Sequence, residues 1–422
     1  MKIRSITYFC NPKYPLDESV LRAAGDFLAQ AKAAYQASGY EVQTTRLATI
    51  PFPKMLGVGQ APALAPGASV ANLPYMAEQL AKAIKEVGIA YASLGPALPD
   101  LPRSYELIPE AIAASENIFF GGVMAGKTDS KLSDSKIYMA AVRACAEVIV
   151  RSALIDSNGF ANLRFAALAN VPPGAPFFPA AYHEGDEPMF AVATEAADLP
   201  VQAFEDAKSL EEGRNTLISE ITKHGQSISR IARDLTQSPT FGGIDFSLAP
   251  FPDDAHSLGG AVEKMGISKI GLHGSLAAAA LLTEAVDRAD FPHTGFSGFM
   301  QPALEDSVLA RRAAEGTLTI KDLLLYSTVC GTGLDTVPLP GDTTSGQLVP
   351  LLLDLCALAL RLNKPLTARL MPVPGKKAGA PTTFDFGFFA NSKVMELESE
   401  SLGGALSGGE TIELPSRNHE HS

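Results

Sequence analysis

The segment 327–346, STVCGTGLDTVPLPGDTTSG, places a cysteine and two aspartates in a stretch rich in glycine and proline. Cys330 comes first, and Asp335 and Asp342 flank a Pro-x-Pro-Gly turn. Glycine permits tight backbone geometry and proline stiffens it. Because a site needs rigid backbone to aim its side chains, we predict that this segment is an irregular functional loop, neither a regular helix nor a regular strand.

Each ionisable group of this segment has two interpretations. Cys330 is either a catalytic thiol or a buried core residue, since free cysteines are among the most buried side chains. Asp335 and Asp342 either ligate a divalent cation or bind backbone amides. Carboxylate oxygens suit Mg²⁺, Ca²⁺ or Mn²⁺ better than a soft metal.

A third aspartate, Asp245, stands inside the apolar stretch GIDFSLAP. A carboxylate in such a strand is costly unless it is paired or bound to a cation. We therefore predict Asp245, together with Asp335 and Asp342, as a cation ligand. The alternative is that Asp245 accepts hydrogen bonds from the backbone of a neighbouring loop.

Two further stretches hold acid–base candidates. KIGLHGSLAAAALL places His273 and Ser275 at a predicted strand-to-helix turn, where free N–H groups favour an anion. Ser275 either contacts the substrate or caps the helix, and His273 is predicted as a catalytic group. Glu305 opens a predicted helix, where an acid either takes part in catalysis or complements the helix dipole.

Substrate-binding residues are predicted from polar side chains at predicted strand ends and in stiff loops. These residues are Asn170, His183, Ser275, Ser297, Lys376 and Lys377. The proline-rich loop that carries His183 is either a semi-rigid lid or surface packing, and the two lysines either neutralise a substrate or are solvated. The stretch GFSG around Ser297 is not a G-x-S-x-G nucleophile elbow. No G-x-x-x-x-G-K-[ST] or G-x-G-x-x-G motif is present, so no nucleotide cofactor is indicated.

Composition restricts the class of protein. The chain has 422 residues, is 46% hydrophobic and 19% charged, and carries a formal net charge of -12. This charge and the lack of a basic cluster argue against a nucleic-acid partner. The four cysteines are far apart, which argues against a zinc ribbon. No apolar run approaches the roughly 20 residues that span a bilayer, so we expect a cytoplasmic protein with no membrane partner. We also expect a homo-oligomer and a small anionic ligand.

Hydrophobic periodicity predicts short strands that alternate with helices. The predicted strands are 3–9, 40–52, 89–96, 117–124, 162–174, 241–250, 295–300, 366–375 and 382–390. The predicted helices are 19–39, 76–88, 104–115, 135–153, 209–235, 258–267, 275–289, 304–316, 319–330 and 346–363. This alternation is typical of the α/β class with a parallel or mixed sheet. We expect one domain, 1–412, and a flexible polar tail, 413–422.

Several long motifs occur in order: DFSLAPFP, GLHGSLAAAALL, FSGFMQPALED, VCGTGLDTVPLPGDT and PGKKAGAPTTFDFGFF. They resemble the bacterial and archaeal family called domain of unknown function 711, also labelled PFL family protein, over residues 1–400. The resemblance implies a ten-stranded α/β barrel of the type in pyruvate formate-lyase and ribonucleotide reductase, with two five-stranded halves and a loop through the centre. Enzymes of that group aim a cysteine from this loop, which would give Cys330 its place.

The chain departs from the glycyl-radical pattern, because it has no C-terminal Arg-Val-Ser-Gly-Tyr run and no adjacent cysteine pair; the nearest glycine is Gly387. We therefore expect an enzyme, lyase-like or hydrolase-like, that acts on a small anionic metabolite in a central pocket, with a divalent cation as a possible cofactor. A non-catalytic metabolite-binding or regulatory protein is one alternative. A remnant or atypical radical enzyme that uses Cys330 is the other.

Overall fold

A computed structural model of the chain describes residues 1–57, 69–127, 135–235 and 238–417. The strands are β1 (Lys2–Cys10), β2 (Val42–Pro51), β3 (Tyr91–Ala97), β4 (Ile118–Lys127), β5 (Ser135–Tyr138), β6 (Phe165–Ala169), β7 (Met189–Glu195), β8 (Thr240–Asp245), β9 (Gly333–Pro340), β10 (Leu366–Val373) and β11 (Thr411–Glu413). The α-helices are α1 (Glu18–Ala37), α2 (Phe52–Met55), α3 (Leu73–Glu86), α4 (Ile108–Ala113), α5 (Met139–Ser152), α6 (Asp198–Glu205), α7 (Leu210–Leu235), α8 (Leu258–Lys264), α9 (Ser275–Asp287), α10 (Ser307–Glu315), α11 (Ile320–Tyr326) and α12 (Ser345–Arg361).

The strands form one mixed sheet whose main path runs β8-β7-β1-β2-β3-β4-β6-β10-β9. Strands β1, β2, β3, β4 and β6 are parallel to one another and form a first group. The second group, β7, β8, β9 and β10, runs in the opposite direction, because β7 is antiparallel to β1 and β10 is antiparallel to β6. The predicted α/β class is therefore confirmed.

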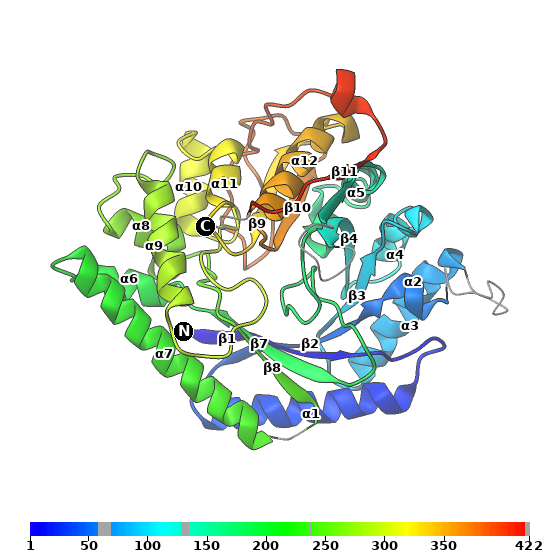
Figure 1. Cartoon of the computed structure of the whole chain (residues 1–422), viewed down its shortest axis with the longest axis horizontal. Helices are drawn as coiled ribbons and strands as arrows, with labels where there is room; N and C mark the ends of the chain where they lie inside the picture. Colours follow the sequence, from blue (N-terminus) through cyan, green and yellow to red (C-terminus); the bar gives the residue numbers. More distant parts are fainter. Residues whose placement is uncertain (58–68, 128–134, 236–237, 418–422) are drawn as a thin grey trace, which may run out of the picture.

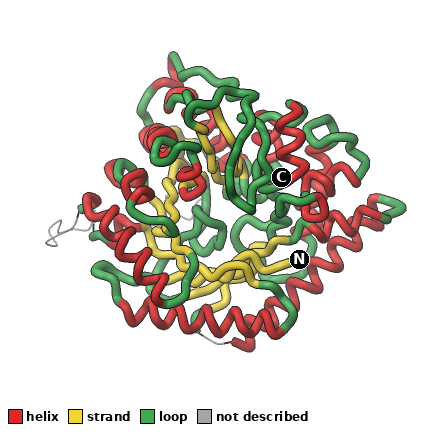
Figure 2. The backbone as a smooth tube through the Cα atoms, turned by 180° about the vertical axis from the view of Figure 1, so that it is seen from behind, coloured by secondary structure: helices red, strands yellow, loops and turns green. Residues whose placement is uncertain are grey.

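The segment 293–302 connects the two ends of this path. Isolated parallel bridges join Ile244 to His293 and Ser247 to Gly298 on the side of β8. Another parallel bridge joins Pro302 to Asp335 of β9. The sheet curves strongly, with helices on its outside and loops in the space that it encloses (Figures 1 and 2).

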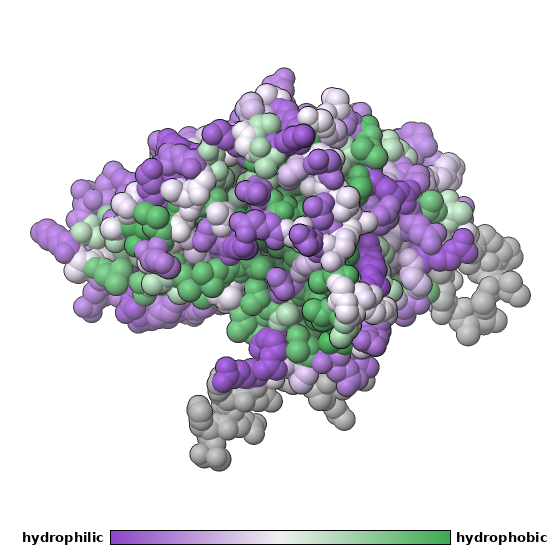
Figure 3. All heavy atoms as spheres, turned by 90° about the horizontal axis from the view of Figure 1, so that it is seen from above, coloured by the Kyte–Doolittle hydropathy of each residue, from purple (hydrophilic) through white to green (hydrophobic). Residues whose placement is uncertain are grey.

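The helices follow from amphipathic patterns that face the sheet. In α1 the buried residues Leu21, Ala24, Leu28, Ala31 and Tyr35 recur at helical spacing, and Asp17 caps the first turn by accepting a hydrogen bond from Ser19 N. The stretch 346–363, predicted as a buried helix, lies largely within α12. Hydrophobic residues also reach the surface in the middle of one face, between hydrophilic margins (Figure 3).

The loop 170–188 joins the first strand group to the second and lies inside the curve of the sheet. Its backbone is fastened to the strands, since Ser93 Oγ donates to Pro179 O at 3.2 Å and His183 N donates to Thr49 O at 2.9 Å. The ring of Phe178 is buried against Phe9 and neighbouring residues of β1, β2 and β7. This loop therefore carries side chains to the centre of the molecule.

Several expectations about local structure are wrong. The segment 295–300, predicted as a strand, has only an isolated bridge from Gly298 to Ser247, and the first residues of the predicted helix 135–153 form the strand β5. The segment 327–346 is not irregular throughout, because it contains β9, whose backbone pairs with β10. The segment 382–390 is not a strand, although it is rich in phenylalanine; its backbone forms turns and loops. Of the tail 413–422, Leu414 N donates to Ser135 O at 3.0 Å, and residues 418–422 lie outside the described residues.

Among the residues described, none of the helices combines the length and the apolar character that crossing a bilayer requires.

Candidate functional site

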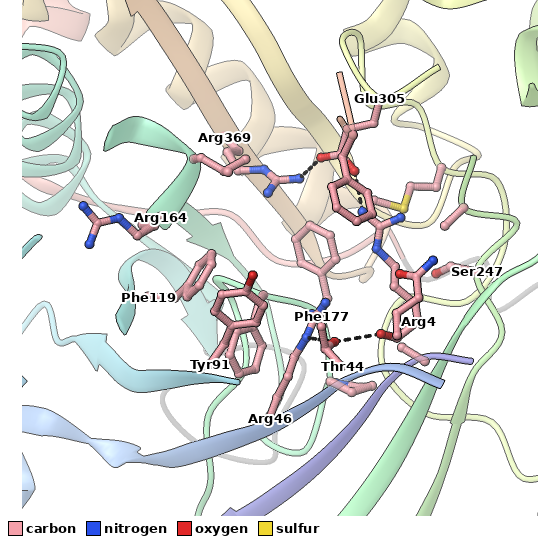
Figure 4. Close-up of a pocket in the computed structure, with 18 of the residues that line it drawn as sticks. Arg4, Thr44, Arg46, Tyr91, Phe119, Arg164, Phe177, Ser247, Glu305 and Arg369 are labelled. Carbon is pink, nitrogen blue, oxygen red and sulfur yellow. Dashed lines mark hydrogen bonds and ion pairs between the residues drawn. The ribbon is translucent and has the colours of Figure 1, made fainter. Parts of the chain in front are cut away.

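A cavity of about 230 Å³ lies inside the curve of the sheet (Figure 4). Its walls come from both strand groups, from the loop 170–188 and from residues near 386. The first group contributes residues from the early parts of its strands, such as Arg4 of β1 and Tyr91 of β3, whereas the second contributes Asp245 at the end of β8. This follows from the opposed directions of the two groups, which bring the amino ends of one and the carboxyl ends of the other to the same opening.

A chain of buried ion pairs crosses one side of the cavity. Arg369 binds both oxygens of Asp335, at 2.5 and 2.9 Å, and its Nη2 also donates to Glu305 Oε1 at 2.8 Å. The other oxygen of Glu305 is bound by Arg4, which also lies 3.4 Å from Glu195. Burial alone would raise the pKa of Glu305, but the guanidinium groups of Arg4 and Arg369 outweigh it and hold this pKa below its ordinary value.

A β-bulge places Arg4 in the cavity. The register of β1 against β7 shifts between Ile3, which faces Thr194, and Ser5, which faces Ala193. The extra residue is Arg4, and a bulge re-aims the side chain that it carries. The guanidinium group of Arg4 reaches Glu305 in this way (Figure 4).

Arg46 of β2 differs from Arg4 and Arg369, because it forms no ion pair with any carboxylate of the described residues. Its Nε donates to Thr44 Oγ1 at 2.9 Å, and its guanidinium carbon lies 5.0 Å from the centre of the Phe178 ring. Burial and the nearby charge of Arg4 lower the pKa of Arg46 to about 9. The terminal nitrogens of Arg46 therefore face the cavity without a neutralising group.

Asp245 also lines the cavity and is held by a tight turn. Its Oδ1 accepts from Ser247 Oγ at 2.6 Å and Ser297 N at 3.0 Å, and its Oδ2 accepts from Phe296 N at 3.0 Å. Burial raises the pKa of Asp245, although these hydrogen bonds act against the rise. Gly295 has φ +64°, and a Cβ there would lie 2.3 Å from Asp245 Oδ2, so this turn requires glycine.

Aromatic rings form much of the remaining wall. Tyr91 and Phe119 meet edge to face at 5.5 Å between ring centroids, and Phe119 contacts Phe178 at 5.5 Å. Arg369 lies over the ring of Phe177 at 5.7 Å. Consecutive phenylalanines of the loop 170–188 thus lie against guanidinium groups from β2 and β10.

The structure brings some of the predicted site residues to the cavity. Asp245 and Glu305 line it, and Asp335 lies behind it, bound to Arg369. Neither His183 nor Asn170 lines the cavity; His183 is a buried residue of the loop 170–188, and burial lowers its pKa. Asn170 begins this loop at φ +56° and donates its N–H to Ala125 O.

The other predicted residues lie elsewhere. Cys330 is buried, its Sγ accepts from Gly333 N at 3.3 Å, and it lines a separate shallow groove together with Ser297 and Lys364. His273 is exposed at the turn before α9, and Ser275 Oγ donates to Leu272 O within that turn.

Of the two predicted lysines, Lys377 is exposed and Lys376 Nζ contacts Thr383 Oγ1 at 3.0 Å; neither lines the cavity. Asp342 is exposed after β9. In the part of the chain that is described, Asp245, Asp335 and Asp342 are not gathered into a group of metal-ligating side chains. The oxygens of Asp245 and Asp335 are taken up by backbone amides, Ser247 and Arg369. The divalent cation stays a prediction.

Sequence reasoning did not select Arg4 or Arg46, although both stand in stretches predicted as strands. A charge inside an apolar strand, the pattern that identifies Asp245, occurs equally in IRSITYF and TTRLATI. That signal identifies an arginine as unusual but does not reveal which arginine lacks a carboxylate partner, because the partners come from distant parts of the chain.

Comparison with known proteins shows the family of this chain. The chain is 34% identical over 287 residues to a UPF0210 protein of Pyrobaculum arsenaticum, which covers 65% of this chain and 61% of that protein, less than two thirds of its length. It is 32% identical over 376 residues to a UPF0210 protein of Pyrobaculum islandicum, covering 85% and 79% of the two chains. A relative from Listeria innocua is 28% identical over 421 residues, covering 94% and 89%. The model of the family described as "Uncharacterised ACR (DUF711)" matches residues 1–392, and the chain belongs to this family.

Proposed function

We propose that the chain is an enzyme that acts on a small anionic metabolite in the cavity between the two strand groups. Arg46 is the anchor for the anion, because its guanidinium group faces the cavity and no described carboxylate neutralises it. Arginine binds carboxylates through two parallel hydrogen bonds, so an anionic ligand would satisfy nitrogens that are otherwise exposed only to the cavity.

Asp245 is the proposed acid–base group. It lines the cavity, and burial raises its pKa, which favours the protonated form that can donate a proton to a bound ligand. Glu305 is neutralised by two arginines and is better suited to hold Arg4 and Arg369 in position. The reaction class, lyase-like or hydrolase-like, stays a prediction from the sequence.

The proposed architecture is a ten-stranded barrel of the pyruvate formate-lyase type. Its support is the division into two parallel groups that run in opposite directions, the bridges of segment 293–302 to β8 and β9, and the loop 170–188 inside the curve. That loop contains no cysteine, and Cys330 lines a different groove. The placement of Cys330 therefore gives no support to radical chemistry in the cavity.

A second candidate function is metabolite binding without turnover. The lining residues described here include no histidine, cysteine or lysine, which leaves few groups able to transfer a proton. Asp245→Asn separates the two functions. Proton magnetic resonance of a mixture of small carboxylic acids incubated with the protein should reveal consumption by the wild type and none by Asp245→Asn; binding without consumption by the wild type would support the second function.

The test of the anchor is calorimetric binding of small carboxylates to the wild type and to Arg46→Gln. Loss of one bidentate contact in a desolvated site should weaken binding about 10- to 100-fold. The matched control is Arg22→Gln, which removes an exposed arginine from α1 and should leave affinity unchanged. Equal binding by the wild type and Arg46→Gln would refute the anchor.

A further inference from the structure

The walls of the cavity are unusually aromatic. Of the 23 described residues that line it, seven are Phe or Tyr, whereas these residues and Trp make up 7% of the chain. The only large aliphatic side chains among them are Leu163 and Met300. A wall of ordinary core composition would have the opposite balance, since Leu, Ile and Val are the commoner core residues of this protein.

The rings are held in fixed planes by one another. Tyr91 packs edge to face on Phe119 with 83° between the ring planes, and Phe119 in turn packs on Phe178. Phe177 is held between Arg369, at 5.7 Å, and Phe296, at 5.2 Å. Rings that are already fixed lose little conformational entropy when a ligand binds between them.

Arg46, the proposed anchor, lies close to the aromatic rings of the cavity wall. The guanidinium group of Arg46 lies over Phe178, and Tyr91 is close enough to influence the pKa of Arg46. Figure 4 shows the end of Arg46 below Phe177, with the rings of Tyr91 and Phe119 to one side. A carboxylate on Arg46 would therefore place its substituent among these rings.

The segment 382–392 adds two rings at the opening. Asn391 closes this segment, since its Oδ1 accepts from Phe384 N at 2.8 Å and its Nδ2 donates to Phe384 O at 3.0 Å. Phe386 and Phe388 project from it to line the cavity, and Phe388 is 40% exposed. An exposed phenylalanine at the mouth of a cavity is surface that a bound apolar group would cover.

We infer that the metabolite is an aromatic carboxylate, whose planar ring lies among Tyr91, Phe119 and Phe177 while its carboxylate binds Arg46. This inference rests on the proposed function and names its class of substrate. Aromatic pairs gain interaction energy beyond the area that they bury, equivalent to about 2- to 12-fold in affinity per pair. An aliphatic ring of the same size buries similar area but has no π face with which to interact with these rings.

The experiment compares three probes by isothermal titration calorimetry: benzoate, cyclohexanecarboxylate and acetate. Benzoate should bind at least threefold more tightly than cyclohexanecarboxylate, and acetate should bind most weakly. Phe119→Leu should reduce the preference for benzoate towards one. Met300→Leu, a change of an aliphatic lining residue, should leave the preference intact, and circular dichroism melts of both variants check folding.

The outcomes separate the two proposals. If benzoate and cyclohexanecarboxylate bind equally, and both lose affinity in Arg46→Gln, the anion site stands and the aromatic inference is wrong. If none of the probes binds to the wild type, the proposed anion site fails together with the inference. Should Phe119→Leu fail to fold, saturation-transfer magnetic resonance on the wild type decides, because stacking requires strong transfer to the ring protons of benzoate and absence of transfer overturns it.

Discussion

The arginines of the cavity differ in the groups that neutralise their charge. Arg369 and Arg4 share Glu305, and Arg369 also holds Asp335, so these guanidinium groups are fixed by carboxylates of the protein. Arg46 also lines the cavity, but among the described residues it forms no ion pair, and its guanidinium group contacts Thr44 and the face of the Phe178 ring. This contrast indicates that Arg4 and Arg369 stabilise the fold around the cavity, whereas Arg46 is available to bind the ligand.

Glu305→Gln should lower the free energy of unfolding by about 3 kcal/mol at pH 7, because it leaves two buried guanidinium groups short of a carboxylate. The folded-state pKa of Glu305 is below the ordinary 4.5, so its ionised form stabilises the fold above pH 4.5 and that stabilisation disappears as the pH falls through the folded-state pKa. The difference between wild type and variant should therefore shrink in acid. Urea titrations at several pH values measure it, and Glu78→Gln, which removes only an exposed pair with Lys82, should change little. A difference that grows in acid would contradict the role of Glu305.

Gly295→Ala tests the turn that holds Asp245. The new methyl group would combine a positive φ with a clash against Asp245 Oδ2, and we expect a loss of about 2 kcal/mol or more in stability. Gly39→Ala is the matched control, since Gly39 has φ +89° but no atom within 4 Å of the added Cβ. Thermal and urea unfolding of both variants isolates the clash; equal losses would show that Asp245 does not constrain this turn.

At the scale of elements, the loop 170–188 carries the greatest consequence for the site. It is neither helix nor strand, yet its buried phenylalanine joins β1, β2 and β7 to the guanidinium group of Arg46. The prolines on either side of Phe177 and Phe178 stiffen this stretch. The loop therefore acts as part of the core as well as part of the wall.

Phe178→Ala should cost about 3 kcal/mol of stability, because it removes a buried ring from that core. The guanidinium group of Arg46 would also lose the surface that orients it, so carboxylate affinity should fall as well. Phe388→Ala removes an exposed ring and serves as the control, with little loss of stability. Urea unfolding and calorimetry measure the two effects, and unchanged stability in Phe178→Ala would mean that the loop is not packed as described.

Much of this element structure could be predicted from the sequence. Amphipathic periodicity located α1 and α12, and apolar runs located β1, β2, β3, β4, β8 and β10. The sequence does not predict β9, because Pro338 and Pro340 are typical of turns. Proline is tolerated at the edge of a sheet, and β9 pairs regularly only with β10. The phenylalanines of 384–389 favour a strand in sequence terms. In the structure they lie on a loop and contribute to the cavity wall and to the core.

At the scale of the whole molecule, the opposed strand groups explain which site residues the sequence could reveal. In parallel sheets, functional groups are expected at the carboxyl ends of strands, and Asp245 lies at such an end, that of β8, whereas Glu305 lies in the loop before α10. The first group presents its amino ends to the same cavity, so Arg46, Tyr91 and Phe119 escaped the rule. The direction of a strand group is a tertiary property that no local pattern encodes.

The two seams between the groups are unequal, and this gives a prediction for the whole fold. Strand β1 pairs with β7 along residues 2–9, whereas β10 pairs with β6 only along residues 366–368. Amide hydrogens at the shorter seam should therefore exchange with solvent faster than those at the longer one, because less pairing must be broken for local opening. Hydrogen exchange read by mass spectrometry tests this order, and slower exchange at residues 366–368 than at residues 2–9 would overturn it.

The order in which the chain is synthesised has a consequence for the cavity. Its wall begins with Arg4, needs Arg46 and Asp245 in between, and is completed by Arg369 and Phe388, so it draws on nearly the full span of the described sequence. In a nascent chain on the ribosome, Arg4 could not pair with the carboxylate of Glu305 until more than 300 residues had emerged. Ligand capture would thus require synthesis at least as far as Phe388, and fragments released earlier would be unable to compete for the metabolite.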